Sequence, residues 1–218
     1  MTLILTPALG RRRFLIGGLA ASGGLLAPGF TLAQSQRVPT PSATPGPFYP
    51  VSFPPDVDND LVLLRGSETK AAGVVTHISG RVVDLAGKPL ANAQVEIWQC
   101  DANGFYLHPG SDGRGRRDSA FQGFGRTRSD PNGAYSFRTI KPVAYSGRTP
   151  HIHFGVNAGE VELVTQMYVA GEALNARDGL YSRIRDPRAR DAVTVRLEAA
   201  NGIENGALAG TFDIVLKA

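Results

Sequence analysis

The sequence predicts an all-β fold: an antiparallel β-sandwich with long loops at one end, preceded by an extended N-terminal arm. Two observations favour this fold class. Residues 78–216 contain short apolar or alternating runs, each bounded by Gly, Pro, Asn or Asp. No stretch of the chain shows helical periodicity of any length. Two packed layers of strands are the usual way for such short strands to bury their apolar faces.

Residues 1–33 predict an export signal. Arg11, Arg12 and Arg13 precede an apolar, glycine-rich stretch, and small residues end the segment at Ala33. The arginine pair resembles a twin-arginine signal; an ordinary secretory signal and a membrane anchor are the alternatives. The apolar run falls short of a span of about 20 residues. We therefore expect a periplasmic or extracellular protein without a stable membrane span once the signal is removed.

Charge and cysteine content narrow the class of protein. Three of the 23 Lys and Arg residues lie in the signal, so the rest of the chain carries 20 against 19 acidic residues. No basic cluster with interleaved aromatic residues remains, which argues against a nucleic-acid partner. The single cysteine, Cys100, excludes an intrachain disulfide. About 185 residues suffice for one domain with one core.

Residues 34–75 predict an extended, proline-rich arm. The stretch 40–50 contains four prolines, which remove backbone donors and restrict the residues before them, so it cannot be a helix. Phe48, Tyr49 and Phe53 are apolar enough to dock on the domain. A disordered linker is the alternative.

Residues 76–218 predict the sandwich domain. Turn signals at 85–90, 130–133 and 158–159 separate runs of strand-forming residues. The expected strands are 78–84, 93–100, 134–140, 151–157, 160–169, 193–198 and 211–216. Residues 101–126 and 141–150 are expected as loops, and 172–192 as a loop with a short helix. Loops this long inside a compact domain are usually functional.

Two histidines at the start of an expected strand suggest a metal site. His151 and His153 are separated by one residue, so they face the same side of the strand. Tyr106 and Tyr145, in the two long loops, are phenols that a hard ferric ion favours. A surface histidine pair, tyrosines packed on the core, and a zinc or copper site using only the histidines are the alternatives. His108 is expected to be a loop residue rather than a ligand.

Several motifs occur in an order and spacing that resemble the intradiol ring-cleavage dioxygenases, the protocatechuate 3,4-dioxygenase and catechol 1,2-dioxygenase family. The resemblance extends over about residues 40–218 and rests on several independent motifs. They are Gly80-Arg81-Val82-Val83-Asp84, Gly87-Lys88-Pro89, Val95-Glu96-Ile97-Trp98-Gln99, the stretch 101–106, Gly125-Arg126-Thr127, the stretch 135–142 and the stretch 148–154, preceded by the entry segment 40–49.

The resemblance implies a non-haem iron(III) dioxygenase. Its ligands correspond to two tyrosinates, Tyr106 and Tyr145, and two histidines, His151 and His153. Tyr145 is also implied to leave the iron when a catechol-type substrate binds. The resemblance further implies that O2 is incorporated to give a cis,cis-muconate-type product. Arg148 and Gln166 correspond to the family's active-site arginine and glutamine; a surface cation and a strand-edge amide are the structural alternatives.

Two departures from the family pattern affect substrate and assembly. The spacing from Tyr145 to His151 is short, which places Tyr145 and Arg148 close together and predicts a more open pocket mouth. The helical dimerisation region of catechol 1,2-dioxygenases has no counterpart in residues 34–75. Catechol, protocatechuate, hydroxyquinol and larger catechols all stay open as substrates, as does a homo-oligomer or a partner subunit. A non-enzymatic exported β-sandwich module that binds carbohydrate or mediates adhesion is the alternative from another class.

Overall fold

A computed structural model describes residues 37–111 and 115–218, all within one compact unit, Gln34–Ala218. The predicted export signal, residues 1–33, lies outside the described residues. No helix among the described residues is both long and apolar enough to cross a membrane.

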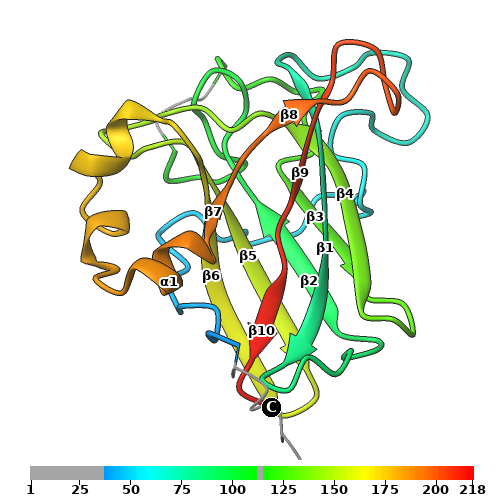
Figure 1. The fold of residues 1–218 in the computed structure, drawn as a ribbon. Coiled ribbons are helices and arrows are strands. Elements are labelled where there is room, and N and C mark those ends of the chain that lie inside the picture. Colours follow the sequence, from blue (N-terminus) through cyan, green and yellow to red (C-terminus); the bar gives the residue numbers. More distant parts are fainter. Residues whose placement is uncertain (1–36, 112–114) are drawn as a thin grey trace, which may run out of the picture. The chain divides into compact units, whose positions relative to one another are not determined.

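Two five-stranded sheets make up the domain (Figure 1). In the first sheet, β1 is hydrogen-bonded on one side to β4 and on the other to β9 and β10. β8 pairs with β9 at the edge of this sheet. This sheet contains β1 (Val75–Asp84), β4 (Ala134–Ile140), β8 (Glu198–Ala199), β9 (Leu208–Thr211) and β10 (Ile214–Leu216). The second sheet, in spatial order, contains β3 (Phe124–Arg128), β2 (Gln94–Trp98), β5 (His151–Ala158), β6 (Val161–Val169) and β7 (Thr194–Val195).

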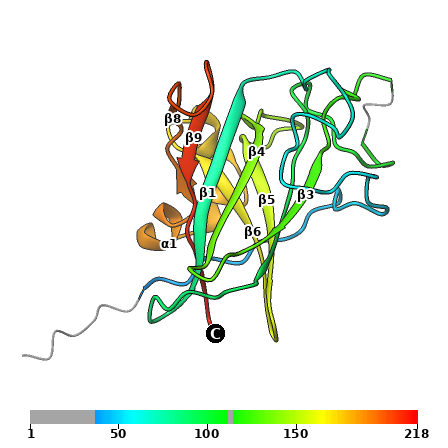
Figure 2. The same cartoon turned by 90° about the vertical axis from the view of Figure 1, so that its right-hand side faces the viewer.

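The predicted all-β sandwich is confirmed, and Figure 2 shows its two layers. The bounds of β4 match the prediction, and those of β5 and β6 differ from it by one residue each. The β5–β6 hairpin turns at Gly159, whose φ of 73° favours glycine. The sheets are mixed rather than purely antiparallel, because β1 pairs in parallel with β9 and β10, and β6 with β7.

Other predicted boundaries were wrong: β1 begins at Val75 rather than at residue 78, and β2 covers Gln94–Trp98 rather than 93–100. The expected loop 101–126 contains the start of β3, and the expected strand 193–198 is two short strands, β7 and β8, in different sheets. The expected strand 211–216 is likewise the end of β9 and all of β10. Between β7 and β8 the chain leaves β6 and joins β9 within a few residues, and β9 and β10 are separate stretches that pair with the same strand, β1. Local alternation does not reveal either feature.

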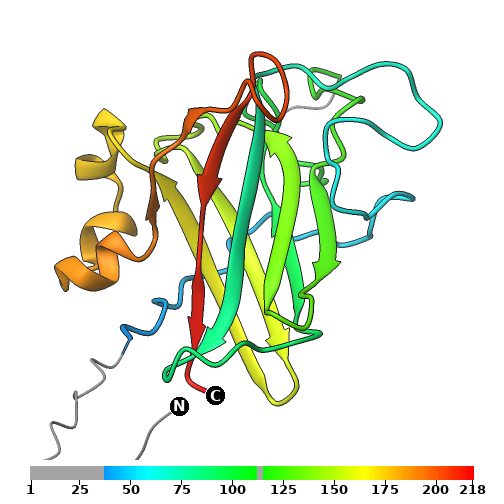
Figure 3. The ribbon, with the colours of Figure 1, turned by 45° about the vertical axis from the view of Figure 1, so that its right-hand side comes forward.

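The predicted extended arm is docked on the second sheet, where Figure 3 shows it in blue and cyan. The Ala43 amide donates to the Val164 carbonyl (2.8 Å) and the Thr165 hydroxyl donates to the Pro41 carbonyl (2.7 Å). Further along, the chain crosses β3 so closely that a Cβ on Gly125 would lie 2.8 Å from the Asp58 carbonyl oxygen. This crossing explains why a strand interior contains glycine.

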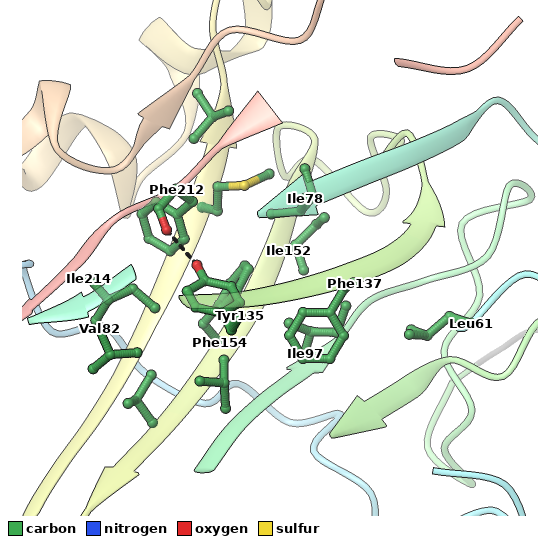
Figure 4. Close-up of a cluster of buried hydrophobic side chains, with 14 of the residues drawn as sticks. Leu61, Ile78, Val82, Ile97, Tyr135, Phe137, Ile152, Phe154, Phe212 and Ile214 are labelled. Atoms are coloured by element: carbon green, nitrogen blue, oxygen red, sulfur yellow. Dashed lines mark hydrogen bonds between the residues drawn. The ribbon is translucent and has the colours of Figure 1, made fainter. Parts of the chain in front are cut away.

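The main apolar core lies between the two sheets (Figure 4). Phe137 of β4 and Phe154 of β5 meet edge to face across it, with ring centroids 6.4 Å apart. Behind them, Gly80 of β1 faces Phe212, where the chain passes from β9 to β10. A Cβ on Gly80 would lie 1.9 Å from the Phe212 carbonyl oxygen, and the Tyr135 hydroxyl donates to that same oxygen. Only glycine fits this close approach.

Residues 173–191 form three short helical segments beside β6 and β7 (Figure 1): η1 (Ala173–Arg177), η2 (Tyr181–Arg183) and α1 (Pro187–Asp191). The sequence predicted one short helix here. At α1, the Asp186 side chain accepts a hydrogen bond from the Arg188 amide and Pro187 occupies the first turn, which is a standard helix start.

Candidate metal centre

His151 and His153 begin β5, and both are almost fully buried, at 1% and 2% exposure. Ile152 and Phe154 alternate with them and enter the core between the sheets. The two histidines therefore face the outer side of the second sheet. Their ring centroids are 4.9 Å apart. The His151 Nδ1 lies 2.6 Å from the Thr149 carbonyl, to which it donates, so the lone pair of His151 is on Nε2.

Tyr145 lies beside His151 because a tight turn, at Ser146 and Gly147, reverses the chain between them. Ser146 and Gly147 both have positive φ, 43° and 76°, as in type I′ turns, and the Arg148 amide donates to the Tyr145 carbonyl (2.7 Å). The Tyr145 hydroxyl is 3.4 Å from the His151 Nε2. The turn places Tyr145 and Arg148 side by side, which confirms the closeness predicted from the short spacing.

Tyr106 completes the group from the loop that follows β2. Its ring centroid is 5.1 Å from that of Tyr145 and 6.1 Å from that of His153. The Asp101 carboxylate shapes the loop by accepting from the amides of Asn103, Phe105 and Asp118. The structure thus brings together all four side chains that the sequence singled out.

The donor set fits a hard trivalent cation. The Tyr106 hydroxyl and the His153 Nδ1 are buried without a hydrogen-bond partner among the described residues. Such orphaned polar atoms are costly unless something satisfies them. The described residues contain no cluster of three or more His, Cys, Asp or Glu; at this site the tyrosine oxygens lie beside the two imidazoles as further donors. Phenolate and imidazole together suit ferric iron.

Burial sets the charge state of these groups in the protein alone. It lowers the pKa of His151 to about 4, with Arg148 adding to the effect, and lowers the pKa of His153 well below its usual value. Both imidazoles are therefore neutral at neutral pH and have free lone pairs. Burial also raises the pKa of Tyr106 and Tyr145. A bound cation would reverse that shift and favour the phenolates.

The docked arm and β2 supply the remaining walls. Phe48 stacks on Tyr106 at 4.8 Å, and a Cβ on Gly46 would lie 3.4 Å from the His153 ring. Trp98 stacks on the His153 ring at 4.9 Å, and its Nε1 donates to the Pro45 carbonyl. The role of Trp98 was not predicted, although it is the direct cross-strand partner of His153.

Arg148 and Gln166 belong to one hydrogen-bond network beside the histidines. The Arg148 Nη2 donates to the Gln166 Oε1 (2.7 Å), and the Tyr168 hydroxyl donates to the same oxygen (2.9 Å). The Gln166 amide nitrogen donates to the Thr44 carbonyl of the arm. Gln166 is 1% exposed, so it is not a strand-edge amide. Arg148 is partly buried and paired, so it is not a simple surface cation.

Asp178 anchors the same network and was missed by the sequence reasoning. Its carboxylate is fully buried and accepts from the Arg148 Nε (2.7 Å) and the Thr149 amide (3.0 Å). Its other oxygen accepts from the amides of Leu180 and Tyr181. Asp178 caps the end of η1, in a stretch with no alternation that would have drawn attention to it.

Acid is expected to weaken the domain through Asp178. Burial alone would raise the pKa of this carboxyl, but the hydrogen bonds from Arg148 and the backbone lower it to about 2. A lowered folded-state pKa contributes stability that is complete above the unfolded-state value near 4 and is lost as pH falls toward 2. The free energy of unfolding in urea, measured on the metal-free protein, should therefore fall more steeply between pH 5 and 2 than that of Asp178→Asn. Parallel slopes would contradict the assignment.

His108 stands outside the group, as the sequence predicted. Its ring packs edge-on against Phe48 at 5.7 Å, and its Nδ1 accepts a hydrogen bond from the Gly110 amide at 3.0 Å.

Comparison with known proteins adds independent information. A protein-family model described as Dioxygenase matches residues 45–218. The chain is 36% identical to the protocatechuate 3,4-dioxygenase beta chain of Burkholderia cepacia, over 74% of this chain and 72% of that protein. It is 32% identical to the catechol 1,2-dioxygenase of Acinetobacter baylyi and 33% identical to the hydroxyquinol 1,2-dioxygenase of Rhodococcus opacus. These two matches cover 76% and 71% of this chain, but only 61% and 54% of the relatives.

Solved structures agree. The dioxygenase domain of a dioxygenase–carbohydrate-binding protein fusion from Streptomyces sp. SirexAA-E superposes with a TM-score of 0.65 at 32% identity, over 83% of this chain and 99% of that domain. The catechol 1,2-dioxygenase of Acinetobacter sp. ADP1 superposes with a TM-score of 0.61 at 26% identity, over 81% and 62% of the two chains.

Proposed function

The chain belongs to the intradiol ring-cleavage dioxygenase family, and from that premise we propose that it cleaves catechol-type rings with O2 at a non-haem ferric iron. Cleavage between the two hydroxyl-bearing carbons incorporates both oxygen atoms and gives a cis,cis-muconate-type product. The observation that carries the proposal is the convergence of two phenols and two neutral imidazoles, two of whose polar atoms are buried without a partner. Relatives with curated activities are oxidoreductases, which disfavours the binding-module alternative.

The iron would be held by Tyr106, Tyr145, His151 and His153. When bound, it supplies Lewis-acid polarisation and electronic activation of the catecholate toward O2. The Thr149 carbonyl fixes the tautomer of His151, and the Trp98 ring fixes the plane of His153. These contacts hold the two imidazoles in place before any ligand arrives.

Tyr145 is the ligand best suited to leave when substrate binds. It is partly exposed and sits on a two-residue turn, whereas Tyr106 is 3% exposed and covered by Phe48. A catechol that bound as a dianion would lose two protons; the freed Tyr145 oxygen would take up one of them, and the other would pass to solvent. Arg148, beside Tyr145, would then stabilise negative charge on the bound ring, as a fixed cation in a partly dry site does. Gln166 fixes one edge of that cation.

The first test is a visible spectrum of the purified protein without residues 1–33. Iron bound by tyrosinate should give a broad visible absorption band that shifts on anaerobic addition of catechol. Admission of O2 should then restore the resting band and release a muconate. Removal of the metal with a chelator should abolish both the colour and the turnover.

Two outcomes would contradict this proposal. A protein that stays colourless after reconstitution with iron would remove tyrosinate ligation. Stoichiometric zinc or copper, with no effect on the spectrum when Tyr106 and Tyr145 are replaced by Phe, would favour a site made from the histidines alone. With turnover established, the rates with catechol, protocatechuate and hydroxyquinol would identify the preferred substrate.

A further inference from the structure

The guanidinium of Arg148 is held through two of its three nitrogens. Its Nε donates to the Asp178 Oδ2 and its Nη2 donates to the Gln166 Oε1, both at 2.7 Å. No hydrogen bond is found for Nη1 among the described residues, and the side chain is 22% exposed. Two hydrogen-bonded nitrogens fix the orientation of a guanidinium and leave its third nitrogen free for a ligand.

The Asp178 carboxylate is itself rigidly placed. Each of its oxygens accepts two hydrogen bonds, three of the four donors are backbone amides, and the side chain is fully buried. Nearby, Asn175 docks the same helical segment through its own bonds, accepting from the Thr149 hydroxyl and donating to the Val169 carbonyl. The Asp178 carboxylate is therefore held in place by backbone amides, and not by the Arg148 side chain alone.

We propose that Asp178 is a positioning residue, which holds Arg148 by its Nε so that Nη1 faces the bound ring; this inference rests on the function proposed above. A free arginine side chain has many rotamers, and fixing one in advance removes that entropic cost from the reaction. The buried carboxylate also balances the charge of Arg148, so the pair keeps one geometry when a catecholate arrives and leaves. The pair acts on the reaction step more than on substrate affinity.

The test is the Asp178→Asn variant, which keeps the shape of the side chain but removes its charge. We expect kcat to fall about 10–100-fold, with anaerobic catechol affinity changed less than about 3-fold and the tyrosinate band unmoved. Asp178→Glu, which restores the charge, should recover part of kcat. In an Arg148→Ala background, Asp178→Asn should cause no further loss of kcat, because its effect passes through the arginine.

Asn175→Ala is the matched control, because it loosens the same segment without contacting Arg148. If it lowers kcat as much as Asp178→Asn does, Asp178 is only structural and the inference is overturned. In Asp178→Asn, a loss of catechol affinity as large as the loss of kcat would overturn it too, and so would a shift of the tyrosinate band.

A measurement that needs no turnover separates this inference from the proposed function. In arginine-selective NMR, the Nε–H of Arg148 should be protected from solvent exchange. It should keep that protection in Asn175→Ala, lose it in Asp178→Asn and regain part of it in Asp178→Glu. An unprotected Nε–H in the unaltered protein would overturn the inference, whatever reaction the protein catalyses. A protected Nε–H in a protein without tyrosinate colour would instead contradict the proposed function alone.

Discussion

Replacing His151 with alanine is expected to abolish iron retention and ring cleavage together. His151 is buried beside Tyr145 and has its Nδ1 committed to Thr149, so only its Nε2 is available and no neighbouring group can substitute for it. Loss of an outer partner of a metal ligand typically costs 10–100-fold, and loss of a ligand should exceed about 100-fold. Metal analysis after gel filtration, together with oxygen uptake on catechol, measures both effects. Tyr106→Phe should lose the tyrosinate band and activity as well.

His108→Ala is the control for that experiment. His108 lies two residues from Tyr106 and packs on the same Phe48 ring, but it takes no part in the tyrosine–histidine group. The variant should keep its iron and at least about half of its activity, as surface substitutions usually do. Iron lost in His108→Ala but retained in His151→Ala would show that the ligand set is wrong.

Gly80→Ala is expected to destabilise the domain by about 3 kcal/mol or more, one of the largest effects available to a single methyl group. The added Cβ would lie 1.9 Å from the Phe212 carbonyl oxygen, and backbone cannot move aside as a flexible side chain can. Separating the strands would also cost the hydrogen bond from the Tyr135 hydroxyl. For a domain of this size, the melting temperature should fall by about 6–12 °C. Urea unfolding of the metal-free protein gives the free energy directly.

Ser79→Ala, one residue earlier on β1 with an exposed side chain, is the matched control. It should change the unfolding free energy by less than about 0.5 kcal/mol. Equal unfolding free energies for Gly80→Ala and Ser79→Ala would show that the Phe212 carbonyl, between β9 and β10, does not approach Gly80 of β1 this closely.

The sequence predicted the regular part of the fold well, since its long strands contain complete alternation. In β4, Tyr135 and Phe137 enter the core while Ser136 faces out, so the pattern alone defined the strand. The four candidate ligands were also identifiable, because tyrosine and histidine are chemically distinctive and stand at fixed positions in recognisable motifs.

Contacts between distant segments were not predictable from local patterns. The Trp98–His153 stack and the Arg148–Asp178 pair each join residues 30 or more positions apart. The local sequence around either member of a pair does not indicate the other member. Short strands such as β7 and β10 are defined by the neighbour that they meet rather than by their own residues. Gly125 of β3 fell in the expected loop 101–126, and only the crossing of the arm explains why a strand interior contains glycine there.

The position of β1 sets the order in which the domain is able to form. Its Thr76 pairs with Leu208 of β9 and its Val82 with Ile214 of β10, while in the arm the Thr40 amide donates to the Val215 carbonyl. Closing loops of more than a hundred residues is slow compared with forming hairpins. During synthesis on a ribosome, β1 would therefore wait with one edge unpaired until residues 208–216 emerge. That interval is when a nascent chain is most exposed to aggregation, and when a chaperone would be most useful.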